Sequence, residues 1–152
     1  MEYRKLSLPS FCVIGKEGTT EDGADFISVL WTEANSRFAE VSHLAMHDEN
    51  GNIRIWGLMS DMSMTFAPWE NGFTKGRYLA GIEVAADAIP PEGWSKWTSP
   101  AYEYVVTPMD SPDAFPLALE FLSENGMSLV GAAYDRTVPG EGNFIYLPTK
   151  KL

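Results

Sequence analysis

Apolar residues recur along this chain with two different periods, and each period predicts one kind of secondary structure. A period of three to four residues predicts a helix over about residues 24–42. A second helix is predicted to begin near Ser111 or Asp113, where Ser111-Pro112 is typical of a helix start, and to end at Asn125-Gly126. The apolar positions of the first helix are Phe26, Ile27, Leu30, Trp31, Ala34, Phe38 and Val41.

Short apolar runs bounded by turn residues predict the strands. Segment 62–72 mixes aromatic side chains with Pro68 and Gly72, which is typical of an irregular loop or a short strand. Two consecutive prolines, Pro90 and Pro91, end any regular element before them. The predicted strands cover residues 11–15, 53–59, 78–86, 101–107, 127–136 and 143–148.

The order of these elements repeats once along the chain. Strand, helix, strand, strand occurs first around the helix at 24–42 and again around the second helix. Two such halves predict one α+β domain over residues 1–152, a tandem βαββ repeat with pseudo-twofold symmetry. We expect the two helices on the outer face of antiparallel sheets and a ligand cleft between the halves.

A carboxylate interrupts the most apolar of the predicted strands. Because side chains alternate between the two faces of a strand, Ile82 and its neighbours two residues away should face a helix, while Gly81 and Glu83 face the other way. Burying an isolated charge is costly, so Glu83 needs a partner or a function. A structural ion pair with Arg54 or Arg77 and a role in binding are both open interpretations.

Composition and charge exclude several classes of function. The formal net charge of −10 argues against a nucleic-acid-binding surface. The sequence has no apolar run long enough to span a membrane and no signal-peptide pattern, and its single Cys12 reads as a buried thiol, so we expect a cytoplasmic protein. His43 and His47 are more typical of a solvated turn than of a metal site, and no phosphate-binding or dinucleotide motif occurs, so no metal and no cofactor are expected.

The strand around Glu83 carries a resemblance to a known family. Tyr78, the run Gly81-Ile82-Glu83-Val84 and the following Ile89-Pro90-Pro91-Glu92-Gly93-Trp94 resemble the GyrI-like small-molecule-binding family, which includes effector-binding domains of bacterial transcription activators. The helix at 25–40 and the closing segment 145–151 fit the same pattern, which therefore covers the whole chain. The resemblance implies a stand-alone domain with Glu83 in a central cleft that binds bulky, planar, often cationic aromatic compounds.

Some stand-alone members of that family are hydrolases of cyclopropane-bearing, DNA-alkylating compounds, and the resemblance makes this activity a hypothesis here. Glu83 would activate water, and Tyr134 would donate to the developing oxyanion. A different hypothesis is an acidic, gyrase-inhibitor-like role with a protein partner, which no motif supports. Each aromatic side chain by itself is also typical of core packing. The candidate ligand-binding residues are Trp56, Phe66, Trp69, Gly81, Trp94, Trp97, Tyr104 and Tyr146.

Overall fold

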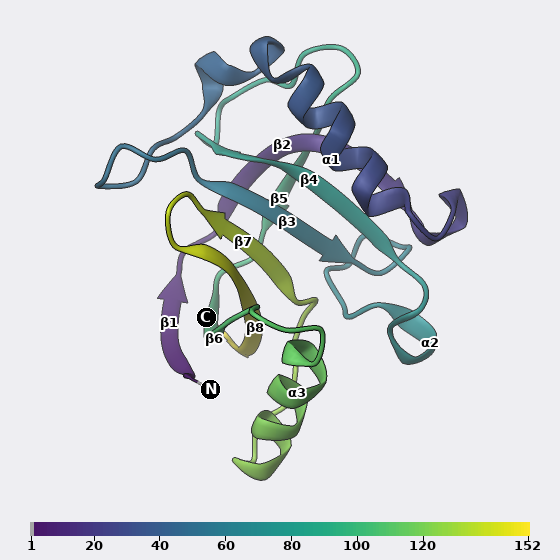
Figure 1. Ribbon diagram of the computed structural model, residues 1–152, viewed down its shortest axis with the longest axis vertical. Helices are drawn as coiled ribbons and strands as arrows, with labels where there is room; N and C mark the ends of the chain where they lie inside the picture. Colours follow the sequence, from purple (N-terminus) through teal and green to yellow (C-terminus); the bar gives the residue numbers. More distant parts are fainter. Residues whose placement is uncertain (1) are drawn as a thin grey trace.

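The computed structural model describes residues 2–152 and contains one curled sheet with helices outside it (Figure 1). Short 3₁₀ turns at Thr20–Asp22, Phe38–Glu40 and Ser42–Leu44 flank the first helix. The helices are α1 (Phe26–Ser36), α2 (Glu70–Phe73) and α3 (Ala114–Glu124). The strands are β1 (Arg4–Leu8), β2 (Phe11–Thr19), β3 (Ile55–Ser60), β4 (Arg77–Val84), β5 (Ser95–Ser99), β6 (Tyr102–Pro108), β7 (Tyr134–Val138) and β8 (Gly142–Lys151).

All neighbouring strands of the sheet are antiparallel, in the order β1-β6-β8-β7-β3-β4-β2-β5. Two very short connections explain its curl. β1 lies at one edge of the sheet, yet only Pro9 and Ser10 separate it from β2 near the opposite edge. In the same way, Pro100 and Ala101 alone separate the edge strand β5 from β6. The two ends of the sheet must therefore approach each other.

The predicted repeat is confirmed. β2, α1, β3 and β4 form one βαββ half, and β6, α3, β7 and β8 form the other. The halves join where β3 pairs with β7, with Trp56 opposite Arg136 and Gly57 opposite Asp135. Each half also receives an edge strand from outside its own repeat, since β1 pairs with β6 and β5 pairs with β2.

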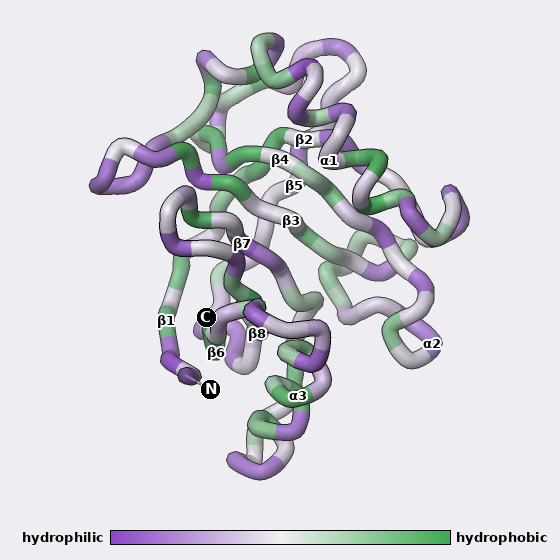
Figure 2. The backbone as a smooth tube through the Cα atoms, viewed as in Figure 1, coloured by the Kyte–Doolittle hydropathy of each residue, from purple (hydrophilic) through white to green (hydrophobic). Residues whose placement is uncertain are grey.

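The helices and the aromatic core lie on opposite faces of the sheet, as the alternation predicts. Ile82 packs with Ala34 of α1 on the outer face. On the inner face, Trp56 and Leu79 pack with tyrosines of the second half in a core rich in aromatic side chains. Helix α3 covers a separate outer core around Val105 and Leu147. Hydrophobic stretches occur in β3 and β4, whereas β7 and several of the connections are largely hydrophilic (Figure 2).

Several elements differ from the sequence prediction. Helix α1 ends at Ser36 and continues only as 3₁₀ turns, and β7 begins at Tyr134 instead of residue 127. Residues just before β7 form isolated hydrogen bonds instead of a strand: the Val130 amide donates to the Pro148 carbonyl of β8, and the Ala132 amide donates to the Phe66 carbonyl in a loop. The prediction also missed β1, β5 and α2, which are each at most five residues long and carry too little periodicity to identify.

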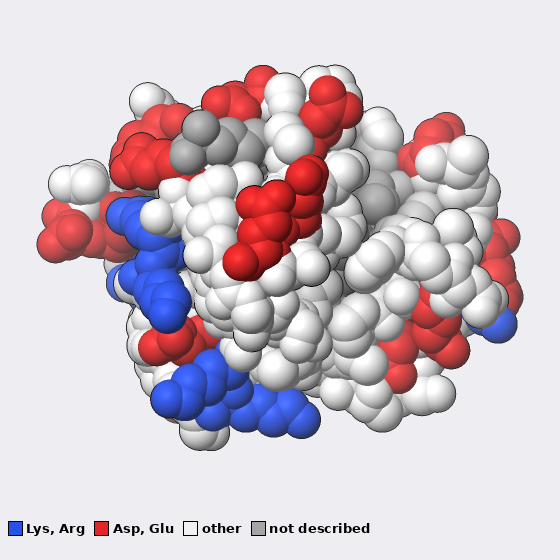
Figure 3. Space-filling view, turned by 90° about the horizontal axis from the view of Figure 1, so that it is seen from below, with Lys and Arg blue, Asp and Glu red and all other residues white. Residues whose placement is uncertain are grey.

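Charges of both signs are spread over the surface. On the face seen in Figure 3, Lys and Arg side chains gather along one side, while Asp and Glu side chains are scattered over the rest. Within residues 2–152, no helix is both long and apolar enough to cross a membrane. The same residues contain no group of three or more His, Cys, Asp or Glu side chains that could hold a metal ion.

Candidate functional site

Glu83 projects from β4 into the inner side of the sheet, where two N–H donors meet its carboxylate. Arg54 Nη1 donates to Oε2 over 2.9 Å, and Trp56 Nε1 donates to Oε1 over 2.9 Å. Glu83 is 8% exposed and Trp56 is 1% exposed. The structural interpretation with Arg54 as partner is therefore confirmed, whereas Arg77 lies near Glu17 instead, at 3.8 Å.

A hollow of about 450 Å³, which we call the Glu83 cleft, opens beside this ion pair. Leu6, Leu8, Pro9 and Phe11 supply apolar lining, and Trp56 also lines the cleft. The Arg136 guanidinium lies 5.3 Å from the centroid of the Trp56 ring. Asp48 borders the cleft, but it accepts hydrogen bonds from the Asn50 and Asn52 backbone amides and so stabilises the turn at residues 48–52. Three carboxylates, those of Glu83, Asp48 and Glu49, line the cleft together with the guanidinium groups of Arg54 and Arg136.

Four tyrosines fill the inner face next to the cleft. Tyr134 and Ser99 share a hydrogen bond of 2.8 Å between their hydroxyl groups, and burial raises the pKa of Tyr134 far above its ordinary value. The buried Tyr104 hydroxyl has no hydrogen-bond partner among the described residues, and burial raises its pKa as well. Tyr146 packs against Trp56 with ring centroids 4.9 Å apart. The predicted catalytic hydroxyl of Tyr134 thus bonds to Ser99 inside the core, and among the described residues no hydrogen bond joins it to Glu83.

The structure brings together only part of the predicted ligand-binding set. Trp56, Tyr104 and Tyr146 share the inner core, and Phe66 and Trp97 pack edge to face in the same core, 6.1 Å apart. Of these five residues, Trp56 alone lines the Glu83 cleft, and the other four do not.

Trp94 and Trp69 lie on the outer face, which corrects their predicted place in a central cleft. Trp94 Nε1 donates to Glu40 over 2.9 Å, and the Lys16 ammonium lies 4.3 Å from the centroid of the Trp94 ring. Trp69 stacks near Phe26 of α1, with ring centroids 6.2 Å apart. Both tryptophans lie outside strands, where the alternation rule cannot assign a face.

Gly81 also has a different role from the one predicted. A β-carbon at this position would overlap with the Ile14 carbonyl oxygen and lie 2.7 Å from the Gly15 α-carbon. Gly81 pairs with Gly15 in the β2–β4 ladder. The space beside Gly81 is therefore occupied by strand β2 itself, and the glycine permits close approach of two strands instead of a ligand.

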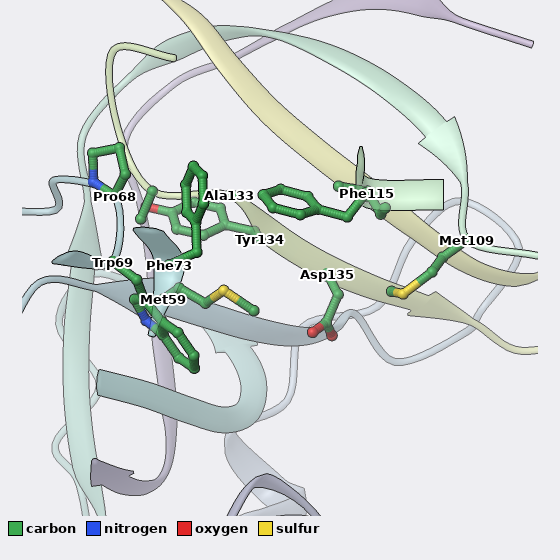
Figure 4. A pocket seen from close by; sticks show the side chains of 11 residues that line it. Met59, Pro68, Trp69, Phe73, Met109, Phe115, Ala133, Tyr134 and Asp135 are labelled. Carbon is green, nitrogen blue, oxygen red and sulfur yellow. The ribbon is translucent and has the colours of Figure 1, made fainter. Parts of the chain in front are cut away.

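A second hollow, the Asp135 pocket, lies on the outer face between the α2 segment and the start of α3 (Figure 4). Its volume is about 300 Å³. Asp135 of β7 is the one charged residue among those that line it, and its carboxylate oxygens are red in the figure. The other lining residues are Met59, Pro68, Trp69, Phe73, Met109, Phe115, Ala132, Ala133, Tyr134 and Ile145.

Asp135 carries its charge with little compensation. The Tyr78 hydroxyl donates to Oδ2 over 2.7 Å, and Trp31 Nε1 donates to that hydroxyl over 3.1 Å. Asp135 forms no salt bridge with any residue of the described chain. Burial raises the pKa of Asp135 to about 6, against the opposing effect of the Tyr78 hydrogen bond. At neutral pH the pocket therefore holds an anion without a cationic partner.

Gly57 makes the Asp135–Tyr78 contact possible. It lies opposite Asp135 in the β3–β7 pairing, and a β-carbon there would overlap with the Tyr78 hydroxyl and lie 2.5 Å from Asp135 Oδ1. The sequence analysis missed Asp135, although one signal was present. Tyr134 and Asp135 are consecutive residues of a predicted strand, so a core-facing Tyr134 places Asp135 on the opposite face.

Comparisons with known proteins identify the fold. No family model matches the chain, and no curated protein matches it. Among solved structures, SAV2435 bound to tetraphenylphosphonium is similar with a TM-score of 0.65 and 17% identity, over 99% of this chain and 94% of that one. The EcmrR C-terminal domain has a TM-score of 0.65 and 16% identity, over 99% and 98% of the two chains. A hydrolase from Listeria innocua has a TM-score of 0.51 and 11% identity, over 98% and 92%.

At these identities the likeness concerns the fold. It agrees with the tandem βαββ architecture that the resemblance to the GyrI-like family implies, and the chain has the GyrI-like fold. What each of these proteins binds or catalyses belongs to that protein.

Proposed function

We propose that this chain, with its GyrI-like fold, binds a bulky aromatic cation in the Asp135 pocket. One observation carries the proposal: Asp135 is a carboxylate without a cationic partner in a pocket that is otherwise apolar and aromatic. A bound cation would supply the missing charge. The likeness in fold to SAV2435, whose structure contains tetraphenylphosphonium, supports the same class of ligand.

The walls of the pocket suit such a ligand. Trp69, Phe73 and Phe115 offer aromatic rings, and the Phe73 and Phe115 centroids lie 5.3 Å apart in an edge arrangement. Aromatic rings attract cations through their electron-rich faces, and this attraction is stronger where water is excluded. Met59 and Met109 add flexible, polarisable side chains that adapt to ligands of different shape.

The Glu83 cleft suits a cation less well. Arg54 already compensates Glu83 at 2.9 Å, and Arg136 lies above the adjacent Trp56. A cationic ligand would have to displace Arg54 or lie near two guanidinium groups, and like charges at short range repel each other. The carboxylate that the sequence made most conspicuous is thus the less favourable anion for this ligand.

A titration with tetraphenylphosphonium tests the proposal. Asp135→Asn keeps the size of the side chain and removes its charge, so affinity should fall about 10- to 100-fold, as expected for loss of a charged contact. Glu83→Gln is the matched control and should change affinity less than about twofold. Triphenylphosphine oxide, which is neutral and accepts hydrogen bonds through its oxygen, should lose no affinity in Asp135→Asn. If affinity falls only in Glu83→Gln, the cation binds in the Glu83 cleft and its assignment to the Asp135 pocket is refuted.

Hydrolytic opening of a cyclopropane ring in the Glu83 cleft is a second candidate function. The favouring observation is that Glu83, ion-paired with Arg54 at 2.9 Å, lies at the wall of a hollow of about 450 Å³, where a carboxylate can accept a hydrogen bond from water. Water oxygen would bond to the ring carbon, the strained carbon–carbon bond would break, and the electron pair and a proton would end on the conjugated carbonyl oxygen. Tyr146 lies nearer to this cleft than Tyr134, since its hydroxyl accepts from Arg136 over 3.4 Å.

Mass spectrometry distinguishes a hydrolase from a binder. Wild type and Glu83→Gln are incubated with a cyclopropane-bearing aromatic alkylator, and the product with one added water is followed over time. Catalysis by Glu83 predicts a rate about 10²–10⁴-fold lower in the variant. Product forming at the rate of the buffer control with wild type would reject this activity.

The cytoplasm is the compartment we propose, because Cys12 is a free buried thiol and no other cysteine exists to pair with it.

A further inference from the structure

The Asp135 pocket continues past its carboxylate into a second hollow on the same face of the sheet. This hollow has a volume of about 420 Å³ and shares Asp135 and Met109 with the pocket. We call it the polar arm. Asp135 therefore lies where two hollows of different character meet, and one elongated molecule can contact both while passing the carboxylate.

The polar arm differs from the pocket in its side chains. Asn35 on α1 and Asn143 on β8 border it, and both are exposed. Thr137 donates its hydroxyl to Asn143 Oδ1 over 2.7 Å, which leaves the amide nitrogen of Asn143 free to donate. No hydrogen bond involves the Asn35 side chain among the described residues. Ile27, Trp31, Ile55 and Met109 also border the arm. Beside them it offers uncharged donors and acceptors, and Asp135 is the one charged residue that borders it.

We propose that the natural ligand is an elongated monocation with an aromatic head and an uncharged polar tail. The head occupies the Asp135 pocket, the cationic centre lies at Asp135, and the tail extends along the polar arm to hydrogen-bond with Asn35 or Asn143. This inference rests on the proposed function and adds the chemical class of the ligand.

The charges and amides disfavour other ligand types. A dication would place its second charge in the arm, where no second carboxylate is present. A purely apolar tail would cover the Asn35 and Asn143 amides without replacing their hydrogen bonds to water, which costs free energy. A tail that carries a hydroxyl or a carboxamide avoids both penalties.

Two matched phosphonium compounds test the inference. Butyltriphenylphosphonium has an apolar tail, and its analogue with a chain of similar length ending in a primary carboxamide has a polar one. Calorimetry should show the carboxamide compound binding wild type about three- to tenfold more tightly than the butyl compound, the gain expected from one hydrogen bond. The variants Asn35→Ala and Asn143→Ala are measured with both compounds, and the exposed Asn50→Ala, outside both hollows, is the control.

Selective loss of the carboxamide advantage in Asn35→Ala or Asn143→Ala, with butyl affinity unchanged, supports the polar arm. Equal affinity of the two compounds for wild type overturns the polar arm and leaves the cation site intact. If neither compound binds wild type, the proposed function and this inference both fail.

Discussion

Two carboxylates on opposite faces of the same sheet have different electrostatic surroundings. Glu83 receives N–H donors from Arg54 and Trp56, one of them charged. Asp135 receives one neutral hydroxyl, from Tyr78, and burial raises its pKa to about 6. A paired carboxylate in such a position holds the structure together, whereas an unpaired one in an apolar pocket is a candidate for binding.

Two consecutive residues of strand β3, Trp56 and Gly57, each shape the surroundings of one carboxylate. Trp56 points to the inner face and binds Glu83, while Gly57 leaves space on the outer face for Asp135 and Tyr78. The Trp56 side chain donates a hydrogen bond to the ion-paired Glu83, and the absence of a side chain at Gly57 permits the close contact of Asp135 with Tyr78. The two sites can therefore be disturbed separately.

Gly81→Ala should have the largest effect, on the strand that carries Glu83. Its β-carbon would overlap with backbone of β2, which cannot rotate away, so the free energy of unfolding should fall by about 3 kcal/mol or more. Urea denaturation measures this loss. Gly18→Ala is the control, because its closest contact, 3.0 Å, is with the flexible Asp22 side chain. Equal losses in both variants would show that Gly81 has no special role in strand approach.

Removing each charge should change stability in opposite directions. Glu83→Gln leaves Arg54 without its carboxylate, so the free energy of unfolding should fall by about 1–3 kcal/mol. The folded-state pKa of Asp135 is raised from 3.8 to about 6, so its ionisation destabilises the fold as pH rises above 4 and does so fully above 6. Asp135→Asn should therefore gain about 1–3 kcal/mol at pH 8 and nothing at pH 3. If both variants are less stable than wild type at pH 8, the two carboxylates do not differ in the way proposed, with Glu83 compensated and Asp135 uncompensated.

Cation affinity should decrease as pH falls, because protonation of Asp135 removes the anion. With a pKa of about 6, roughly a tenth of the carboxylate remains ionised at pH 5, so tetraphenylphosphonium should bind about tenfold more weakly there than at pH 8. Calorimetry at several pH values measures the change. Asp135→Asn should give a flat profile, and a retained pH dependence in that variant would assign it to another group.

Tyr78→Phe should have the smallest effect and sharpen the assignment of the pH dependence. The Tyr78 hydroxyl stabilises the ionised form of Asp135, so its removal should move the midpoint of the affinity profile to higher pH, by at most about one pH unit. Tyr104→Phe is the matched control, since that hydroxyl is buried on the inner face without a partner. If the pH midpoint of the affinity profile is unchanged in Tyr78→Phe, the Tyr78 hydroxyl does not influence the ionisation that controls binding.

Local periodicity determined a large part of this structure. The spacing of apolar residues predicted the two long helices, the order βαββ in both halves, and the opposite directions of Ile82 and Glu83. It succeeded because a helix or a strand fixes the directions of its own side chains, whatever lies around it. Edge strands β1 and β5 escaped prediction, since five residues carry too little periodicity to identify a strand.

Only the tertiary structure decided which carboxylate is compensated. Both are single acidic residues on predicted strands, and the sequence made Glu83 the more conspicuous because its strand is more apolar. The β3–β4 register brings Arg54 and Trp56 to Glu83, whereas Asp135 meets side chains from α2 and α3 that carry no positive charge. Alternation assigns a residue to a face of a strand, but the cost of burying its charge depends on neighbours that distant segments supply.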